Sequence, residues 1–318
     1  MKISASLIIK NEESMLGKCL RSISQCDEIC IVDTGSTDNS IKIARKAGAK
    51  VYTEYKWADN FSEARNVSMN QCTGDWLLII DADEILETTI PIIRDLISQP
   101  FMKDKNAVMF KVNTGRETND QIRLFRNLPN IQWIGAAHNL PYMIENGRAV
   151  KMKGLHYSTF KIKSNFSPNH IVDPDRTLRI MTGELRKGPQ GLGRDQYTRY
   201  LYYVAREWLN RKDPIRALYF LNDYVKIAPP TNELADAWFL IASCNIDLGK
   251  LEESIDACLQ VIKYLPSYKA PYAVLHNLSS PDNKALWERM FHYADNKGVL
   301  FVRTEAEKLI KETIGKKK

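Results

Sequence analysis

Short apolar runs alternate with amphipathic stretches along the first 100 residues. A continuous apolar run bounded by turn residues is typical of a buried strand, whereas apolar positions at helical spacing indicate a helix. These patterns predict strands at 4–9, 28–32, 50–52 and 76–80, and helices at 11–23, 40–47 and 61–72. Because strands that alternate with helices usually pair in parallel, we expect an open α/β sheet. Ligands of such sheets bind beyond the carboxyl ends of the strands, and Asp33 and Asp81 both follow predicted strands.

The pattern changes after residue 105. Residues 108–112 and 121–126 are typical of strands, and the short strands and turns that continue to His156 indicate a mixed or antiparallel edge. A polar segment rich in Pro, Gly and Asn follows, with one predicted helix at 176–185, and the chain is helical from residue 196 onward. We therefore expect three parts: an α/β domain over 1–160, a linker and helix bordering the site over 161–195, and an all-helical domain over 196–318.

The helical part contains a repeat. One helix pair matches the key positions of the tetratricopeptide motif, which has about 34 residues; these positions are Trp238, Ile241, Ala242, Asn245, Gly249, Ser254, Cys258, Val261 and Pro266. The preceding stretch repeats the spacing with Leu201, Val204, Ala205, Trp208, Ala217, Leu221, Tyr224 and Pro229. The alternative is a generic helical bundle. Because about three repeats are needed to close such a core, we expect the helices between Lys284 and Ile314, or a partner subunit, to complete it.

Composition excludes several classes of protein. The chain has 318 residues, of which 44% are hydrophobic and 26% charged, so it can bury a core and is neither disordered nor a disulfide scaffold. The net charge of +7 is mild, and the basic residues are scattered without interleaved aromatic residues, which disfavours nucleic-acid binding. No run approaches the roughly 18 apolar residues of a membrane span. The six cysteines form no C-x-x-C pair, so we expect reduced thiols and a cytoplasmic location.

Two D-x-D triplets occur in different surroundings. Asp81-Ala82-Asp83 follows a buried run, so a strand delivers two carboxylates to the open edge of the sheet. Two carboxylates there repel each other unless a cation accompanies them, and oxygen ligands suit Mg²⁺ or Mn²⁺, which can bridge to a diphosphate. The alternative is a helix N-cap pair. The second triplet, Asp173-Pro174-Asp175, lies in the polar linker and is typical of a solvated turn.

Asp33 is a carboxylate at a second strand end. The Thr-Gly-Ser-Thr-Asp segment after it predicts a tight loop with free backbone N–H groups, which favours polar ligands, although a plain turn is the alternative. The chain has neither G-x-x-x-x-G-K-[ST] nor G-x-G-x-x-G, which disfavours a kinase or a dehydrogenase.

Four segments in this order and spacing resemble a known family. They are residues 6–13 (SLIIKNEE), 32–38 (VDTGSTD), 60–66 (NFSEARN) and 74–84 (GDWLLIIDADE). Together they resemble the family 2 glycosyltransferases, which have the GT-A nucleotide-sugar fold. The resemblance is to the branch with a C-terminal tetratricopeptide-like domain, including peptide S-glycosyltransferases of the sublancin type. It implies a GT-A catalytic domain with an open sheet over 1–160, followed by an all-α tetratricopeptide-like domain.

The resemblance also implies roles for individual residues. Asp33 would hydrogen-bond a uracil ring, and Asp81 would face the ribose. Asp83 would ligate the metal, with His156 completing the metal site, although a structural loop histidine is the alternative. Arg123 and Arg126 could neutralise phosphate charge. The other implied donor-binding residues are Ile9, Lys10, Asn11, Glu12, Arg65 and Ala82.

One departure from the family concerns the general base. Many relatives have Glu after the His of a Trp/Phe-x-Gly segment, but in this chain His138 is followed by Asn139, which is no useful proton acceptor. His138, Glu117 and Asp120 are therefore the candidate bases. A thiol acceptor, which ionises more readily than a hydroxyl, would need less help from a base.

These observations predict a metal-dependent enzyme that moves a hexose from a UDP-sugar to a Ser, Thr or Cys side chain of a peptide or protein. Mn²⁺ or Mg²⁺ is the expected cofactor. The helical domain would bind the acceptor or pair two subunits. One alternative is a glycosyltransferase acting on lipopolysaccharide or another surface glycan. Another is a non-catalytic protein that binds nucleotide sugars.

Overall fold

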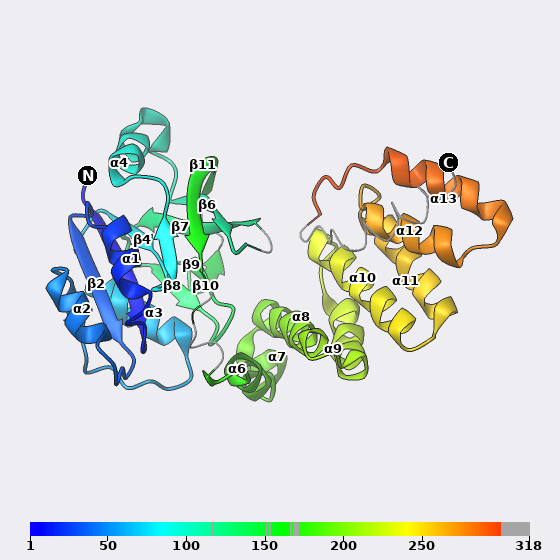
Figure 1. Ribbon diagram of the computed structural model, residues 1–318, viewed down its shortest axis with the longest axis horizontal. Helices are drawn as coiled ribbons and strands as arrows, with labels where there is room; N and C mark the ends of the chain where they lie inside the picture. The colour runs from blue at the N-terminus through cyan, green and yellow to red at the C-terminus, as the bar shows by residue number, and fades with distance from the viewer. Residues whose placement is uncertain (116–117, 151, 153, 166, 168–171, 300–318) are drawn as a thin grey trace. The chain divides into compact units, whose positions relative to one another are not determined.

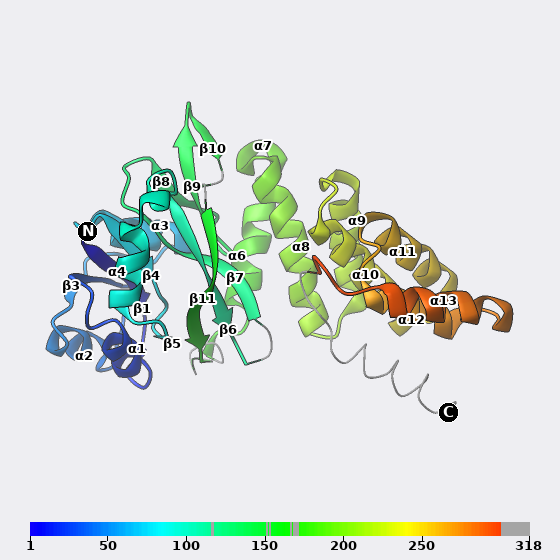
Figure 2. The same cartoon turned by 90° about the horizontal axis from the view of Figure 1, so that it is seen from above.

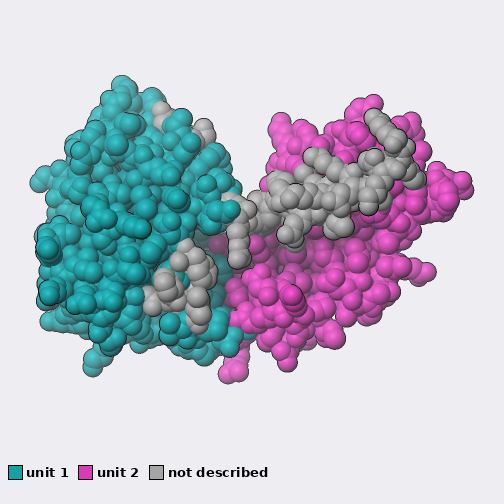
Figure 3. All heavy atoms as spheres, in the orientation of Figure 1, with its two compact units in different colours: residues 1–180 teal, residues 181–318 magenta. Residues whose placement is uncertain are grey.

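The computed structural model describes residues 1–115, 118–150, 152, 154–165, 167 and 172–299. The chain divides into two compact units, Met1–Ile180 and Met181–Lys318, which Figure 3 shows in different colours. The first unit is an α/β unit and the second is helical (Figure 1). The expected fold class is confirmed. The boundary falls inside the segment 161–195 that we expected to be a linker, and the limits of the three expected parts stay a prediction.

The first unit is built on one mixed sheet whose strand order is β3-β2-β1-β4-β7-β6-β11-β5. β1 pairs in parallel with β2 and β4, and β2 pairs in parallel with β3, as the alternating pattern predicted. β7 is antiparallel to both β4 and β6. The strands are β1 (Ile3–Ile9), β2 (Glu28–Asp33), β3 (Lys50–Tyr52), β4 (Trp76–Ile79), β5 (Glu84–Leu86), β6 (Ala107–Asn113), β7 (Thr118–Arg126) and β11 (Gly154–Ser164).

A second, three-stranded antiparallel sheet lies between β7 and β11 in the chain. It has the order β10-β9-β8 and consists of β8 (Ile131–Ile134), β9 (Leu140–Glu145) and β10 (Arg148–Val150). The antiparallel character expected for the region up to His156 is therefore confirmed, in part as a separate sheet. The helical segments of the first unit before β6 are α1 (Leu16–Ser22), α2 (Ser40–Lys46), α3 (Phe61–Asn70), α4 (Ile90–Ser98) and the 3₁₀ turn η1 (Pro100–Met102).

The first helix begins later than predicted. We expected it over 11–23, whereas α1 begins at Leu16. Asn11 adopts a left-handed backbone conformation with φ of 54°, and its N–H donates to the Ser36 hydroxyl at 2.9 Å. The N–H of Glu12 donates to the Ser40 hydroxyl at 2.7 Å. These hydrogen bonds and the left-handed conformation of Asn11 hold residues 11 and 12 in a loop, and the helical hydrogen bonds begin with the Leu16 N–H, which donates to the Glu12 carbonyl at 2.8 Å.

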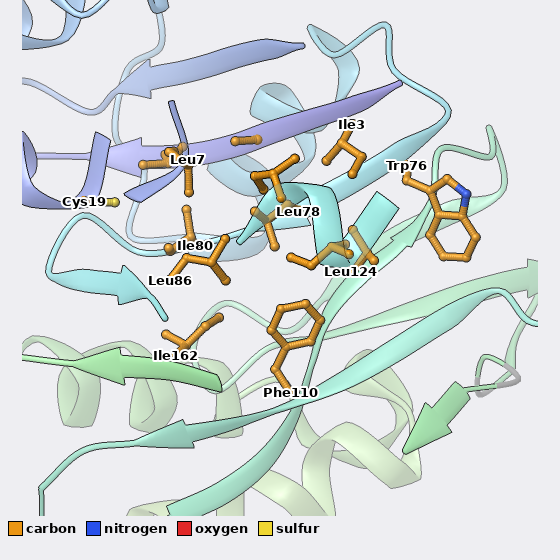
Figure 4. Packing of buried hydrophobic residues seen from close by; sticks show 14 of the residues in the cluster. Ile3, Leu7, Cys19, Trp76, Leu78, Ile80, Leu86, Phe110, Leu124 and Ile162 are labelled. Carbon is orange, nitrogen blue, oxygen red and sulfur yellow. The ribbon is translucent and has the colours of Figure 1, made fainter. Parts of the chain in front are cut away.

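The hydrophobic core of the first unit packs around the central strands. Figure 4 shows Leu7 of β1, Leu78 of β4, Leu124 of β7 and Phe110 of β6 gathered in one layer. Each of these side chains is at most 1% exposed. Burying one such side chain contributes about 1.5–3 kcal/mol. The core therefore fixes β4, and with it the position of the residues that follow its carboxyl end.

The second unit consists of helices that pack against their neighbours in chain order, from α8 to α13 (Figures 1 and 2). Ala217, Leu221 and Ala242, which the repeat pattern singled out, are fully buried in its core. No helix among the described residues has the length and apolar character that crossing a bilayer requires. The helices after β11 are α6 (Arg176–Leu185), α7 (Gly188–Leu192), α8 (Arg194–Asn210), α9 (Pro214–Ile227), α10 (Asn232–Asp247), α11 (Leu251–Tyr264), α12 (Lys269–Leu278) and α13 (Pro281–Tyr293).

Glu28 links three segments at the amino-terminal end of β2. Its carboxylate accepts hydrogen bonds from the Lys50 ammonium at 2.6 Å, the Ser4 hydroxyl at 2.6 Å and the Thr73 N–H at 2.7 Å. Burial alone would raise the pKa of Glu28, but these donors outweigh it and lower the pKa to about 2. The ionised form of Glu28 therefore stabilises the fold.

We predict that Glu28→Gln lowers the free energy of unfolding at pH 7 by about 1–3 kcal/mol, the typical contribution of hydrogen bonds to a charged group. The pKa of Glu28 is lower in the folded state than in the unfolded state. The loss in free energy of unfolding relative to wild type is therefore complete above about pH 4.5, and it shrinks as the pH falls towards about 2. Urea unfolding between pH 7 and pH 3.5 measures it. Glu54→Gln, at an exposed position, is the control. A difference that stays constant over this range would contradict the prediction.

Candidate functional site

The candidate site is built at the carboxyl ends of β1, β2 and β4. The loops after β1 and β2 are joined by hydrogen bonds, including one from the Thr37 N–H to the Asn11 side-chain oxygen at 2.7 Å and one from the Glu13 N–H to Asp38 at 3.1 Å. The Thr34 N–H donates to the Ile9 carbonyl at 2.9 Å. The first two sequence segments of the family resemblance therefore lie side by side.

Asp33 offers an acceptor that nothing in the described part of the chain uses. Its Oδ2 accepts the backbone N–H groups of Gly35 at 3.0 Å and Ser36 at 2.9 Å. Its Oδ1 is buried and has no hydrogen-bond partner among the described residues. A buried acceptor left without a donor costs about 1–3 kcal/mol. Asp33 is therefore prepared to accept a hydrogen bond from a ligand N–H group.

Asp81 lies just after β4 and is paired with two arginines. Arg65 Nη2 is 2.7 Å from Asp81 Oδ1, and Arg123 Nη1 is 3.6 Å from Oδ2. Arg65 also lies over the Trp133 ring, 4.9 Å from its centroid, which fixes the guanidinium. Although burial opposes ionisation, the two guanidinium groups lower the pKa of Asp81 well below its usual range.

Glu84 completes this network and was not predicted as a site residue. It is 3% exposed, its Oε1 accepts from Arg123 Nη2 at 2.7 Å, and its Oε2 accepts from the Asp81 N–H at 2.9 Å. Burial raises the pKa of Glu84 to about 7, against the lowering effect of Arg123. A third acidic residue immediately after the D-x-D triplet was the available sequence signal. Arg123 is only 6% exposed, so this ion pair is largely removed from water.

Asp83 has a different environment from Asp81. Its Oδ2 accepts the Ser167 N–H at 3.3 Å, and the Ser167 hydroxyl lies 2.9 and 3.0 Å from the Glu12 carboxylate oxygens. Burial and, after it, the nearby carboxylates of Asp81, Glu84 and Glu12 together raise the pKa of Asp83 to about 7. Negative charges that converge on one carboxylate favour a bound cation.

The donor set fits a divalent metal. Hard cations such as Mn²⁺ and Mg²⁺ prefer carboxylate oxygens. The carboxylate of Asp83 lies near those of Asp81, Glu84 and Glu12, whereas both guanidinium groups pair with Asp81. His156 lies in β11 opposite Met109, but its side chain is outside the described part of the structure. Its role as second ligand stays a prediction.

Of the three candidate bases, the structure describes His138 and Asp120. His138 is exposed in the loop after β8, with a left-handed φ of 45°. Asp120 lies in β7 and pairs with Lys111 at 3.1 Å, and Glu117 lies outside the described residues. The side-chain nitrogen of Asn139 is buried and has no hydrogen-bond partner in the described ranges. The choice of base stays a prediction.

Arg126 does not belong to the site. It pairs in register with Trp76, at the amino-terminal end of β4, whereas Asp81 and Asp83 follow the carboxyl end. Its guanidinium donates to the backbone carbonyls of Met102 and Lys105, each at 3.0 Å, and lies over the Trp76 ring. The expectation that Arg126 neutralises phosphate charge is therefore wrong, because its donors close a loop at the opposite end of the strand.

We predict that Arg123→Met destabilises the first unit by about 3–5 kcal/mol, because it leaves Glu84 as a buried charge without its partner. Adding Glu84→Gln in the same chain should recover a large part of this loss. Urea unfolding of wild type, both single variants and the double variant forms a double-mutant cycle that measures the coupling. Additive effects of the two substitutions would show that the pair is not coupled.

Comparison with protein-family models gives one match: residues 4–133 match the family "Glycosyl transferase family 2". A TPR repeat-containing protein from Synechococcus elongatus is 38% identical over 144 residues, which cover 44% of this chain and 35% of that protein. The prophage-derived glycosyltransferase SunS from Bacillus subtilis is 28% identical over 224 residues, covering 64% of this chain and 49% of SunS. The lipopolysaccharide core biosynthesis glycosyltransferase LpsC from Rhizobium meliloti is 32% identical over 115 residues, covering 35% of this chain and 42% of LpsC.

The aligned regions thus span less than half the length of each of these curated relatives. Among solved structures, residues 1–349 of S. aureus TarS in complex with UDP-GlcNAc are similar with a TM-score of 0.45 and 15% identity, covering 100% of this chain and 93% of that one. The matched residues contain all four of the segments that suggested the resemblance. Residues 4–133 are therefore a family 2 glycosyltransferase domain.

Proposed function

We propose that this chain is a metal-dependent glycosyltransferase that moves a hexose from a UDP-sugar to a nucleophilic acceptor. The observation that carries the proposal is the carboxylate cluster after β4. Two arginines pair with Asp81, whereas burial and the nearby carboxylates of Asp81, Glu84 and Glu12 raise the pKa of Asp83. The family 2 domain supports the transferase class. The expected cytoplasmic location stays a prediction.

Asp83 would hold Mn²⁺ or Mg²⁺, with His156 as the proposed second protein ligand. When bound, the metal stabilises the negative charge that develops on the diphosphate leaving group. Arg65 and Arg123 hold Asp81 in place, so that the second carboxylate of the triplet remains available to the donor. The network therefore orients the donor site before the sugar arrives.

Asp33 would read the base of the donor. The uracil ring carries an N–H donor at position 3, and the unpartnered Oδ1 of Asp33 is an acceptor of the matching kind. The backbone of residues 9–12 lies beside the Asp33 loop and would line the nucleotide pocket. Side chains of the loops after β1 and β2 hydrogen-bond one another. Asp33 Oδ1 is the acceptor there that would bind the uracil ring.

A peptide or protein is the acceptor that we favour, with a Ser, Thr or Cys side chain as the nucleophile. The helical unit would bind the acceptor or pair two subunits, since repeat helices commonly provide protein-binding surfaces. The similarity to LpsC favours a second candidate, in which the acceptor is a lipopolysaccharide or another glycan. Incubation with UDP-sugars, Mn²⁺ and each class of acceptor, followed by mass spectrometry, separates the two.

We predict that Asp83→Asn abolishes the Mn²⁺-dependent part of UDP binding and weakens UDP at saturating Mn²⁺ by more than about 10-fold, because a ligand to the metal is lost. Without metal, the variant should be at least as stable as wild type, since the substitution removes a carboxylate that faces other carboxylates. Isothermal titration of UDP with and without Mn²⁺ measures the first effect, and thermal unfolding measures the second.

The matched control is Asp173→Asn in the other D-x-D triplet, where Asp173 pairs with Arg179 on the exposed surface. This variant should bind UDP like wild type. Wild type that binds UDP equally tightly with and without Mn²⁺ would overturn the metal-dependent mechanism. Wild type that binds no UDP under either condition would overturn the proposed donor.

We further predict that wild type prefers UDP to CDP and that Asp33→Asn loses this preference. Cytosine has a ring acceptor where uracil has the N–H donor, so CDP leaves the buried Oδ1 of Asp33 without a partner. The cost of about 1–3 kcal/mol corresponds to about 5- to 150-fold in affinity. Competition between UDP and CDP, measured on wild type and Asp33→Asn, tests this. If wild type binds UDP and CDP with equal affinity, Asp33 does not discriminate between uracil and cytosine.

A further inference from the structure

A pocket of about 530 Å³ lies within the helical unit, and none of its lining residues belongs to the candidate donor site. Its walls come from α9 and α11, and α10, which packs against both, contributes the floor. Figures 1 and 2 show these three helices next to one another. Each helix presents one stripe of residues: Leu218 and Asn222 from α9, Trp238, Ile241 and Asn245 from α10, and Glu253, Asp256, Ala257 and Gln260 from α11.

The pocket arises from a departure from the repeat pattern. In the tetratricopeptide motif, the first helix carries Trp and, seven residues later, Tyr, and the second helix carries Phe. This chain keeps the first aromatic residue as Trp238 but has Asn245 at the Tyr position and Cys258 at the Phe position. Asn245 lines the pocket together with Trp238, whereas Cys258 is fully buried and is not among the lining residues.

The pocket lining is suited to a cation. The carboxylates of Glu253 and Asp256 lie one helical turn apart on α11, and neither makes a hydrogen bond or ion pair within the described ranges. Side-chain amides of Asn222, Asn245 and Gln260 add further acceptor oxygens. With Lys250 as the remaining charged lining residue, the charge of the lining is 1 − 2 = −1.

Apolar side chains border the pocket on the same helix faces. Ile215 and Tyr219 are 69% and 67% exposed, and their spacing places them on the same stripe of α9 as Leu218. Leu259 of α11 lines the pocket and is itself 42% exposed. Exposed apolar residues around a polar pocket mark a protein-binding surface. A free metal ion or a small inorganic cation would make no use of this border.

We propose that this pocket binds a protein or peptide segment through an arginine or lysine side chain, whose charged end meets Glu253 and Asp256 while neighbouring apolar residues of the segment cover Ile215, Tyr219 and Leu259. The alkyl stem of the basic side chain lies along Trp238 and Ile241. Charge complementarity selects this ligand over an acidic peptide. The proposal does not depend on the proposed sugar transfer, because no donor-site residue takes part in it.

The test uses the tripeptide acetyl-Leu-Arg-Leu-amide as the probe, titrated into the full chain while the indole N–H signals of the six tryptophans are followed by NMR. Trp238→Phe assigns the Trp238 signal. We expect this signal to shift in a saturable way, and acetyl-Leu-Lys-Leu-amide to act similarly. The uncharged matched probe acetyl-Leu-Gln-Leu-amide should bind at least 10-fold more weakly. The double variant Glu253→Gln/Asp256→Asn should weaken the arginine probe by at least 10-fold.

The double variant changes only exposed charges, and an unaltered far-UV circular dichroism spectrum confirms that it folds. The arginine probe is added to roughly 10 mM, about a 10-fold molar excess over the protein. The proposal is overturned if the Trp238 signal shows no saturable shift over this range, because a dissociation constant above roughly 10 mM corresponds to a binding free energy weaker than about 2.7 kcal/mol. Equal binding of the arginine and glutamine probes would overturn it as well. A shift with maltose and none with the arginine probe would identify a glycan site instead.

Discussion

The candidate donor site depends on how charge is distributed at the carboxyl end of β4. Four carboxylates, those of Glu12, Asp81, Asp83 and Glu84, meet the two guanidinium groups of Arg65 and Arg123. Burial, together with the neighbouring carboxylates, raises the pKa of Asp83 to about 7, and burial raises the pKa of Glu84 to about 7, so both groups are partly protonated near neutral pH. Metal binding would then replace protons.

The fold holds this unfavourable charge cluster because it fixes the backbone on both sides of it. β4 is buried between β1 and β7, so residues 81–84 cannot move apart to relieve the repulsion. The Asn165 N–H donates to the Asp83 carbonyl at 2.9 Å, which ties the triplet to the end of β11. Opposite the site, the Glu28 hydrogen bonds join β2 to β1 and to the segment after α3.

Local patterns were sufficient to predict much of this arrangement. The apolar runs predicted β1, β2 and β4, and with them the placement of Asp33 and Asp81 at strand ends. The start of α1 was not predictable in this way, because Ser36 and Ser40, far along the chain, bind the donors of Asn11 and Glu12. Only the tertiary structure brings those hydroxyl groups to that loop.

The two arginines of β7 show the same limit. Arg123 and Arg126 both occupy basic positions of one strand pattern, yet one pairs with Asp81 and the other closes a loop at the far end of β4. The antiparallel register between β7 and β4 decides which is which, and a single strand pattern carries no information on register. Glu84 was missed for a related reason, since its role requires Arg123 opposite it.

In both units, an asparagine stands where the relevant pattern has a residue of different chemistry. Asn139 follows His138 where many relatives of the family have Glu, and its side-chain nitrogen is buried without a partner among the described residues. Asn245 stands at the Tyr position of the repeat, beside a pocket that a tyrosine would fill. A substitution that loses packing or hydrogen bonding without local compensation is expected where a ligand supplies the missing contact. An amide at this position cannot remove a proton from an acceptor, so a nucleophile that ionises readily would need less help here than a hydroxyl.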